Sequence, residues 1–279
     1  MYKLLFFIGF FIGFPSAVIA QQSTLTFAVV PQQSAKRLAT LWTPILQHIN
    51  DQTDLNIVFT TAKDIPTFEK RLESGEYDIA YMNPYHYVVY NQSSGYNALA
   101  KQSNKTIQGV LVAHADGKVK NIQDLAGSQL AFPAPAAFAA SLLPQAELNN
   151  LGLEYTPKYV GSHDSVYLNV SRGFFPAGGG IQRTLNNMDE NTQSTLVTIW
   201  KSARYTCHAI ATHPNVDAAT RDKILAVLLN MNNSEQGKAL LKSINFNGFD
   251  GAQNSDWDDV RALNIDALMT SKPATALAN

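Results

Sequence analysis

Short apolar runs alternate with segments of helical periodicity along almost the whole chain, and this alternation restricts the fold more than any other feature. Runs rich in β-branched and aromatic residues predict strands, and apolar residues that recur three or four positions apart predict helices. In the first part of the chain the predicted strands and helices take turns, over residues 25–30, 34–49, 55–60, 67–72, 77–81 and 84–91. Such alternation predicts a parallel sheet with helices on both faces.

The same pattern resumes after Asn104 and predicts a second unit. Strands are predicted at 108–114, 129–132, 155–160, 177–180, 195–199 and 208–212. Helices are predicted at 121–127, 135–150, 162–172, 216–230, 234–244 and 256–269. Two α/β units in one chain of 279 residues predict an α/β fold of two lobes joined by hinge strands. Ligands of open α/β sheets bind beyond the carboxyl ends of the strands, so we expect a binding site between the lobes.

The first 20 residues have the composition of a secretory signal peptide. Lys3 is the positive end, residues 4–14 form the apolar core, and Val18 and Ala20 fit the positions before a cleavage site. An apolar core of about 11 residues is shorter than the roughly 20 needed to span a bilayer, which disfavours an uncleaved membrane anchor. We therefore predict cleavage after Ala20 and export to the periplasm, and no lipid anchor because no Cys follows the cut.

Composition excludes several classes of partner. Lys and Arg number 21 and Asp and Glu 22, which gives a formal net charge of −1. A chain without a basic excess cannot neutralise a phosphate backbone, so we expect no nucleic-acid partner. Cys207 is the only cysteine, so the chain can form neither an internal disulfide nor a metal centre built from several cysteines.

Motifs of the common enzyme classes are missing. The sequence has no Gly-x-Ser-x-Gly elbow, no Walker A loop and no His-Glu-x-x-His helix, and Gly178-Gly179-Gly180 lacks the spacing of a phosphate loop. Cys207 and His208 are adjacent, and neighbouring side chains on a strand point to opposite faces, so they do not form a catalytic pair. We expect a protein that is not an enzyme and has no cofactor or metal.

Three motifs give the chain a family resemblance. They are Tyr-Asp-Ile-Ala-Tyr-Met-Asn-Pro-Tyr-His-Tyr at 77–87, Gly-Ser-His-Asp-Ser-Val-Tyr-Leu-Asn-Val at 161–170 with Ala-Gly-Gly-Gly at 177–180, and Asn-Ile-Gln-Asp-Leu-Ala-Gly at 121–127. With these motifs the chain resembles the periplasmic phosphate-, phosphite- and phosphonate-binding proteins of ABC importers, the PhnD-like family. The resemblance implies a type II periplasmic-binding-protein fold, a small-molecule ligand and an ABC permease as partner. It also implies a monomer whose first lobe comprises residues 21–106 and 208–279 and whose second lobe comprises 107–207.

The resemblance also implies which residues line the pocket. They are Gln33, Tyr81, Asn83, Tyr85, Ala134, Ala136, Ala137, His163, Asp164, Tyr205 and Cys207. In the family an anion binds a helix N-terminus after the strand that ends here at Phe132, where unpaired amides and the helix dipole favour negative charge. Hydroxyl residues normally accompany those amides. This chain has Ala134, Pro135, Ala136 and Ala137 in their place, so we expect binding through the amides of Ala136 and Ala137 and an altered specificity.

Structural roles remain open for the same residues. The alanines are also typical of a well-packed helix, and the tyrosines of a core. His163 and Asp164 follow Ser162, a good N-cap, so either could serve only the start of a helix. Cys207 could be a small buried hydrophobic residue.

A second function of a different class uses the same fold. The chain could be a periplasmic sensing subunit that reports an oxyanion or an arsenite-like ligand to a membrane histidine kinase. Cys207 is the residue that suggests it, because a soft thiolate suits a soft ligand. Binding that survives a Cys207→Ser replacement would exclude the thiol from such a site.

Overall fold

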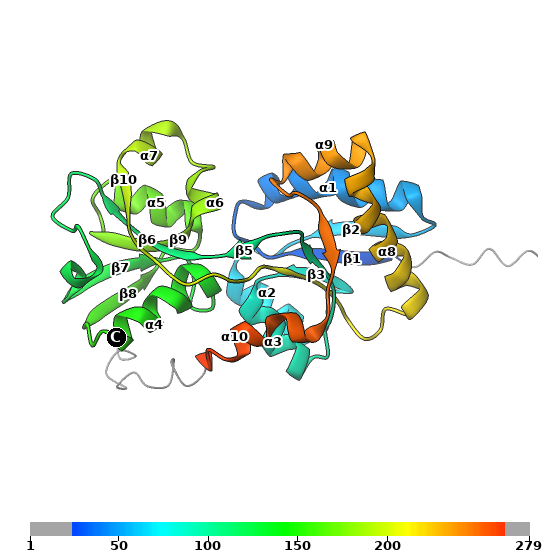
Figure 1. The fold of residues 1–279 in the computed structure, drawn as a ribbon, viewed down its shortest axis with the longest axis horizontal. Helices are drawn as coiled ribbons and strands as arrows, with labels where there is room; N and C mark the ends of the chain where they lie inside the picture. Colours follow the sequence, from blue (N-terminus) through cyan, green and yellow to red (C-terminus); the bar gives the residue numbers. More distant parts are fainter. Residues whose placement is uncertain (1–23, 266–279) are drawn as a thin grey trace, which may run out of the picture.

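The structure, a computed structural model, describes residues 24–265 and consists of two α/β lobes side by side (Figure 1). The expected signal peptide at 1–20 and the end of the helix expected at 256–269 lie outside the described residues. No helix within residues 24–265 is both long enough and apolar enough to cross a membrane.

The first lobe contains a sheet of six strands. The strands are β1 (Thr24–Val29), β2 (Asn56–Thr60), β3 (Ile79–Met82), β4 (Asn97–Gln102), β12 (Ala209–Thr212) and β13 (Phe249–Gly251), in the order β13-β4-β12-β3-β1-β2. The strands expected from the first part of the chain, β1 to β3, are parallel, but β12, β4 and β13 are antiparallel to their neighbours. The expectation of a parallel sheet is therefore confirmed for the strands from which it was made, and the other three strands make the whole sheet mixed. Neither β4 nor β13 was expected, because alanine, lysine, glutamine and glycine have low strand propensity.

Helices cover both faces of this sheet (Figure 1). They are α1 (Ala35–Gln52), α2 (Ile65–Glu73), α3 (Pro84–Ser93), α8 (Ala218–Asn230) and α9 (Glu235–Ser243). Capping residues set where they begin: Ser34, Asp64 and Asn83 each accept a hydrogen bond from a backbone N–H of the first turn. Where a helix was expected from residue 256, the described chain has a 3-10 turn, η4 (Asn254–Trp257), and the short α10 (Asp258–Arg261), and Asn264 then adopts left-handed backbone with φ 46°.

The second lobe has a mixed sheet of five strands. They are β6 (Gly109–His114), β7 (Ser128–Phe132), β8 (Tyr155–Tyr159), β9 (Ala177–Ile181) and β10 (Leu196–Lys201), in the order β10-β6-β9-β7-β8. Its helices are η1 (Ile122–Leu125), η2 (Phe138–Leu142), α4 (Leu143–Asn150), α5 (His163–Ser171), α6 (Gln182–Leu185) and α7 (Glu190–Ser194). The helix expected at 135–150 begins three residues later, as the π-helical turn η2.

Glycines bring η2 close to this sheet. Gly109 on β6 and Gly179 on β9 face the carbonyl oxygens of Ala139 and Ala140 so closely that a Cβ at either glycine would overlap them. The Ala-Gly-Gly-Gly run is therefore a packing device: it lets the backbone of η2 lie directly on the strands. Single π-turns of this kind occur often at functional sites.

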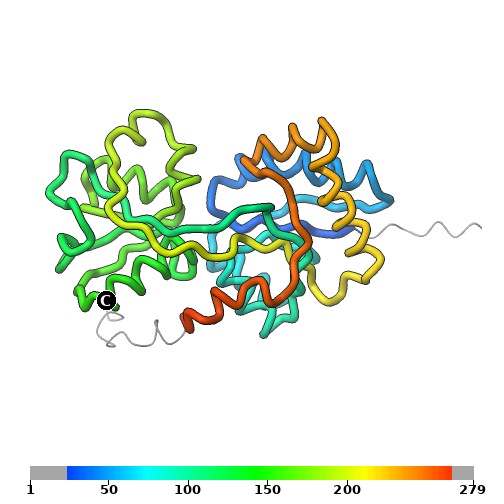
Figure 2. Tube along the Cα trace, viewed as in Figure 1, coloured from blue at the N-terminus to red at the C-terminus, as the bar shows by residue number. Residues whose placement is uncertain are grey.

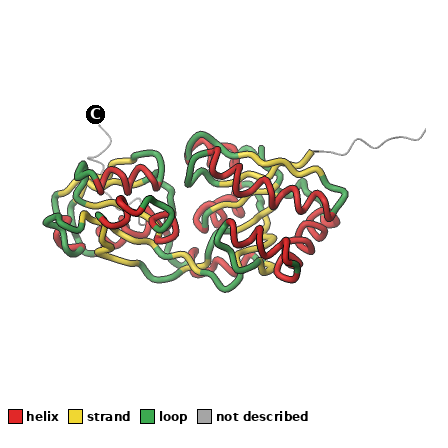
Figure 3. Tube along the Cα trace, turned by 90° about the horizontal axis from the view of Figure 1, so that it is seen from above, coloured by secondary structure: helices red, strands yellow, loops and turns green. Residues whose placement is uncertain are grey.

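Two crossings of the chain join the lobes, as the tube in Figure 2 shows. They contain β5 (Thr106–Ile107) and β11 (Tyr205–Thr206), which pair antiparallel. The view from above separates the lobes on either side of this short ribbon (Figure 3). A narrow two-stranded connection is the usual construction of a hinge between lobes.

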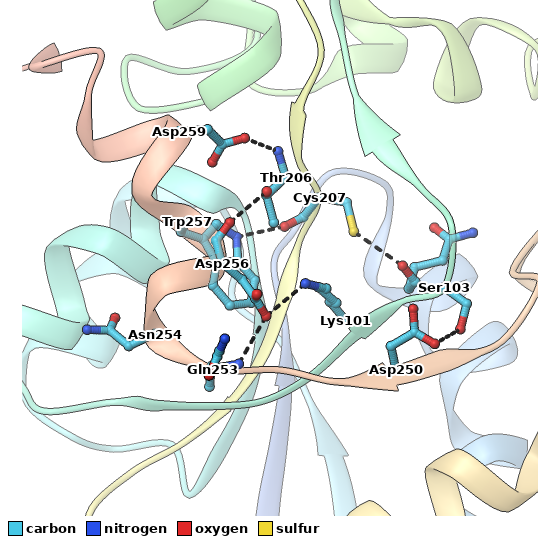
Figure 4. A network of polar contacts seen from close by, with 12 residues as sticks. Lys101, Ser103, Thr206, Cys207, Asp250, Gln253, Asn254, Asp256, Trp257 and Asp259 are labelled. Carbon is cyan, nitrogen blue, oxygen red and sulfur yellow. Dashed lines mark hydrogen bonds and ion pairs between the residues drawn. The ribbon is translucent and has the colours of Figure 1, made fainter.

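The C-terminal segment of the described chain holds β11 against the first lobe (Figure 4). Thr206 donates through its N–H to Asp259 at 2.6 Å and through its hydroxyl to the carbonyl of Asp256 at 2.7 Å. The indole of Trp257 donates to the carbonyl of Cys207 at 2.9 Å, and Lys101 forms an ion pair with Asp256 at 2.7 Å. These contacts fix one end of the hinge to the first lobe.

Candidate functional site

The candidate site is the cleft between the lobes, where three cavities adjoin. The deep cavity, about 10 Å³, is lined by Asn83, Ala137, Phe138, Ala139, Ala140, His163 and His208 among others. The outer cavity, about 50 Å³, includes Gln33, Arg37, Trp42, Thr184, Asn187 and Asn245. The hinge-side cavity, about 270 Å³, lies between the lobes and the crossings and includes Lys105, Gln108, Gln182, Lys201, Arg204 and Cys207.

The cavities share walls and so form one cleft. His208 lines the deep and hinge-side cavities, and Tyr81 and Arg183 line the hinge-side and outer ones. The deep cavity has room for about one water molecule, so a larger ligand can bind there only if the lobes move slightly apart.

An aromatic stack forms the wall of the first lobe. Tyr81 lies on β3, with its ring 5.0 Å from that of His208 at an interplanar angle of 17°. Its other neighbour is Trp42, at a centroid distance of 4.7 Å. Gln32, after β1, contacts the Nε2 of His208 at 2.9 Å and thereby fixes the imidazole. Burial raises the pKa of Tyr81, so its hydroxyl stays protonated and can donate.

Asn83 connects the two lobes. Its side-chain oxygen accepts from the N–H of His86 and so caps α3, while its Nδ2 donates to the carbonyl of Ala136 at 3.1 Å. Ala136 belongs to the second lobe, so this hydrogen bond spans the cleft. Behind it His86 contacts Glu69 at 2.9 Å, which places that histidine in the support of the site and not in the cleft itself.

The start of η2 lines the deep cavity from the second lobe. The N–H of Ala137 donates to the carbonyl of Ala134 at 3.3 Å, so the expected amide of Ala137 is already used. The first N–H groups of a helix have no intrahelical acceptor, and here these belong to Phe138, Ala139 and Ala140. Of the two amides expected to bind a ligand, that of Ala137 is engaged in this turn and that of Ala136 stays a prediction, while those of Phe138, Ala139 and Ala140 are further candidates.

His163 is buried at the N-terminus of α5, capped by Ser162, and it lines the deep cavity. Its Nδ1 lies 3.5 Å from the hydroxyl of Thr184, which itself donates to the carbonyl of Ile181. Burial, reinforced by the charge of Arg183, lowers the pKa of His163 to about 4. Burial likewise lowers the pKa of His208. Both imidazoles are therefore neutral at pH 7, and each has one N–H to donate.

Asp164 faces Arg37, a residue of the other lobe. Burial raises the pKa of Asp164, and the charge of Arg37 acts in the opposite direction. One carboxylate oxygen of Asp164 is buried and has no hydrogen-bond partner within the described residues. The pair thus adds a long-range attraction between α5 and the start of α1 across the cleft.

Arg183 was missed by the sequence analysis. It follows β9 directly, on α6, and its charge acts on Tyr81, Cys207, His163 and His208. Its guanidinium lies 5.9 Å from the ring of Phe246 in the first lobe. The position of this arginine, two residues after a strand that ends at the cleft, was the signal in the sequence that could have found it.

The remaining expected residues are divided between the cleft, the hinge and the core of the first lobe. Tyr85 is half-buried and packs against the core of the first lobe. Gln33 lines the outer cavity. Tyr205 lies in the hinge, with its ring edge-on to Phe138 at 5.7 Å. Cys207 is buried beside the hinge-side cavity, and its thiol contacts the carbonyl of Gln102 at 3.8 Å.

The cleft offers no arrangement for metal binding within residues 24–265, because no three His, Cys, Asp or Glu side chains there are grouped to hold an ion. Burial also raises the pKa of Cys207, which disfavours the thiolate. What the cleft offers instead is a set of neutral donors from both lobes, with cationic side chains along the outer and hinge-side cavities.

Comparisons with known proteins agree with this geometry. Residues 27–257 match the sequence model of a family described as the phosphonate, periplasmic substrate-binding protein of ABC transporters. A relative from Mycolicibacterium smegmatis, the phosphate-import protein PhnD, is 24% identical over 212 residues, which cover 68% of this chain and 64% of that protein. The match thus spans less than two thirds of that relative's length.

Two solved structures share the fold. A binding protein component of an ABC phosphonate transporter from Pseudomonas aeruginosa superposes with a TM-score of 0.81 at 15% identity, covering 91% of this chain and 90% of that one. PhnD1 from Prochlorococcus marinus in complex with methylphosphonate superposes with a TM-score of 0.79 at 17% identity, covering 89% and 99%. The expected type II periplasmic-binding fold is thereby confirmed.

Proposed function

Because the chain belongs to the family of periplasmic substrate-binding proteins of phosphonate ABC transporters, we propose that it captures a small phosphonate-type oxyanion between its lobes and delivers it to a membrane permease. The observation that carries this proposal is the convergence of donors on the deep cavity. Asn83 and His208 reach it from the first lobe, and His163 and the free amides of η2 reach it from the second.

Oxyanion binding without hydroxyl side chains is chemically reasonable in this cleft. The N–H groups of Phe138, Ala139 and Ala140 belong to the N-terminal turn of the helix that continues as α4. This end of the helix dipole is positive and attracts an anion. Each hydrogen bond to a charged acceptor contributes about 1.5–3 kcal/mol. Three amides and two imidazoles therefore offer enough donors to replace the hydration of a small oxyanion.

Closure of the lobes is the functional event in this proposal, and no covalent chemistry is involved. A ligand that contacts both lobes shifts the population toward the closed form, since its contacts are complete only there. We propose that residues 21–106 and 208–279 move as one body and 107–207 as the other. The ribbon of β5 and β11, held by Trp257 and Asp256, is the proposed pivot.

The family works in the periplasm, and we propose that the signal peptide at 1–20 exports this chain there. The permease partner and a monomeric state are part of the same proposal. The sensor alternative has little support in the site, because the one thiol is buried and its pKa is raised, so a soft thiolate ligand is disfavoured.

The test is a calorimetric titration with methylphosphonate of protein purified from the periplasm after expression of the full chain. We expect the His163→Ala variant to bind at least about tenfold more weakly, a loss of roughly 1.4 kcal/mol. The matched control is His114→Ala, at the far end of β6. Wild-type protein that binds no phosphonate would refute the proposed function, and equal affinity of wild type and His163→Ala would refute the role of His163.

A further inference from the structure

The hinge-side cavity is the roomiest part of the cleft, at about 270 Å³. Tyr81 and His208 bound it on the first lobe, Ile181 and Arg183 on the second, and the two crossings close its back. It shares His208 and Ile181 with the deep cavity, where the proposed oxyanion binds. A substituent on that oxyanion would therefore extend into the hinge-side cavity.

Positive charge is concentrated around this cavity. Lys105, Arg183, Lys201 and Arg204 line it, and no aspartate or glutamate does. Within residues 24–265, the ion pairs of the structure involve other cations, so no carboxylate neutralises these four. The chain as a whole has a net charge of −1, so the cluster is a local feature and not a consequence of a basic protein.

The four cations differ in depth, which gives the cavity a direction. Lys105, Lys201 and Arg204 are exposed at the rim, whereas Arg183 is half-buried at the inner wall. Arg204 is held at the hinge by a 3.5 Å contact of its Nη1 with the hydroxyl of Thr106. Charges of one sign that line a concave site attract and concentrate ligands of the opposite sign.

From this geometry we infer that the ligand carries a second anionic group, a carboxylate or phosphate attached to the phosphonate, which the hinge-side cavity receives. The inference rests on the proposed function and specifies its ligand class. In this inference the three rim cations and Arg183 hold the second anion together, and the guanidinium of Arg183 can match a carboxylate or phosphate through two parallel hydrogen bonds.

The same cluster selects against zwitterionic phosphonates. The ammonium group of an aminoalkylphosphonate would face four cations with no carboxylate to compensate it. Repulsion of this kind discriminates between ligands even when the common phosphonate group makes the same contacts.

The test compares ligands that differ in one group, titrated calorimetrically into the protein. The probes are methylphosphonate, 3-phosphonopropionate, 2-aminoethylphosphonate and ethane-1,2-diphosphonate. We expect 3-phosphonopropionate to bind at least about tenfold more tightly than methylphosphonate and 2-aminoethylphosphonate. The diphosphonate shows whether a carboxylate or a second phosphorus group is preferred. Succinate and pyrophosphate test the cavity without any phosphonate.

A triple variant, Lys105→Gln/Lys201→Gln/Arg204→Gln, tests the source of the selectivity. All three side chains are exposed, so the variant should fold. We expect the affinity ratio of 3-phosphonopropionate to methylphosphonate to fall below about threefold. The control variant Lys63→Gln/Lys70→Gln/Lys118→Gln removes the same charge outside the hinge-side cavity and should keep the ratio.

The outcomes separate this inference from the proposed function. If methylphosphonate binds and a carboxylate adds no affinity, or if the ratio survives in the triple variant, the inference is refuted and the proposed function stands. If no phosphonate binds but succinate or pyrophosphate does and needs the rim cations, the proposed function fails and the anion cavity stands. If no anion binds, both are refuted.

Discussion

The replacement of Gly179 by alanine tests how the sheet of the second lobe positions the binding amides. A Cβ at Gly179 would lie 2.8 Å from Cδ1 of Phe132 and 3.0 Å from the carbonyl carbon of Ala140, and nearer still to that carbonyl oxygen. Carbon atoms in contact prefer about 3.5–4.0 Å, so η2 and β9 must separate by on the order of 1 Å. The separation moves the backbone of Phe138 to Ala140, which line the deep cavity.

Both stability and affinity should respond to Gly179→Ala. Overpacking of this kind costs about 1–3 kcal/mol, and in a chain of this size each kcal/mol lowers Tm by roughly 2–4 °C. We therefore expect Tm in thermal unfolding to fall by about 2–12 °C. We also expect methylphosphonate to bind at least about tenfold more weakly, because the displaced amides no longer converge with His163.

The matched control is Gly251→Ala on β13. No atom lies within 4 Å of a Cβ built at Gly251, so this alanine should change the free energy of unfolding by less than about 0.5 kcal/mol. A Gly179→Ala protein with the Tm and the affinity of wild type would refute the reasoning. It would mean that η2 does not depend on a glycine at this position.

Two further outcomes follow from the site. The pKa of His163 is lowered to about 4, so the folded protein binds fewer protons than the unfolded chain between pH 6.5 and 4. The free energy of unfolding should therefore decrease as the pH is lowered through that window. The full decrease in the free energy of unfolding from this histidine is on the order of 3 kcal/mol. In denaturant unfolding, the free energy of His163→Gln should therefore depend less steeply on pH than that of wild type, and equal dependence would contradict the argument. Asn83→Asp keeps an oxygen that caps α3 but loses the donor to Ala136, so small-angle scattering should show a larger radius of gyration. Asn83→Ala loses the donor and the cap, so it should show the same change in radius and also lose about 1 kcal/mol of the free energy of unfolding through the missing cap. Scattering curves identical to wild type would show that this bond does not hold the lobes together.

Much of the secondary structure could be predicted from local pattern. The strands β1 to β3 and the helices between them were expected within a few residues, because their apolar periodicity and caps are encoded locally. Strands β4 and β13 were not expected, since their residues have low strand propensity and the strands exist only by pairing in the sheet.

The candidate site, too, was predicted from the sequence only in part. The motif around Tyr81 and Asn83 and the one around His163 could be read directly, and the structure brings these residues to one cleft. The choice of amides could not be read, because the turn that uses the N–H of Ala137 depends on how η2 lies on Gly109 and Gly179.

By itself, the sequence determined the two α/β units, the family, and the absence of an enzyme motif, because these depend on local periodicity and on short contiguous motifs. Only the tertiary structure decided that Arg183, from the second lobe, stands beside Tyr81 and His208, and that four cations surround one cavity. The reason is physical: charges more than 70 positions apart in the chain act on one another only after the two crossings have brought the lobes together, as Lys105 and Arg183 do here.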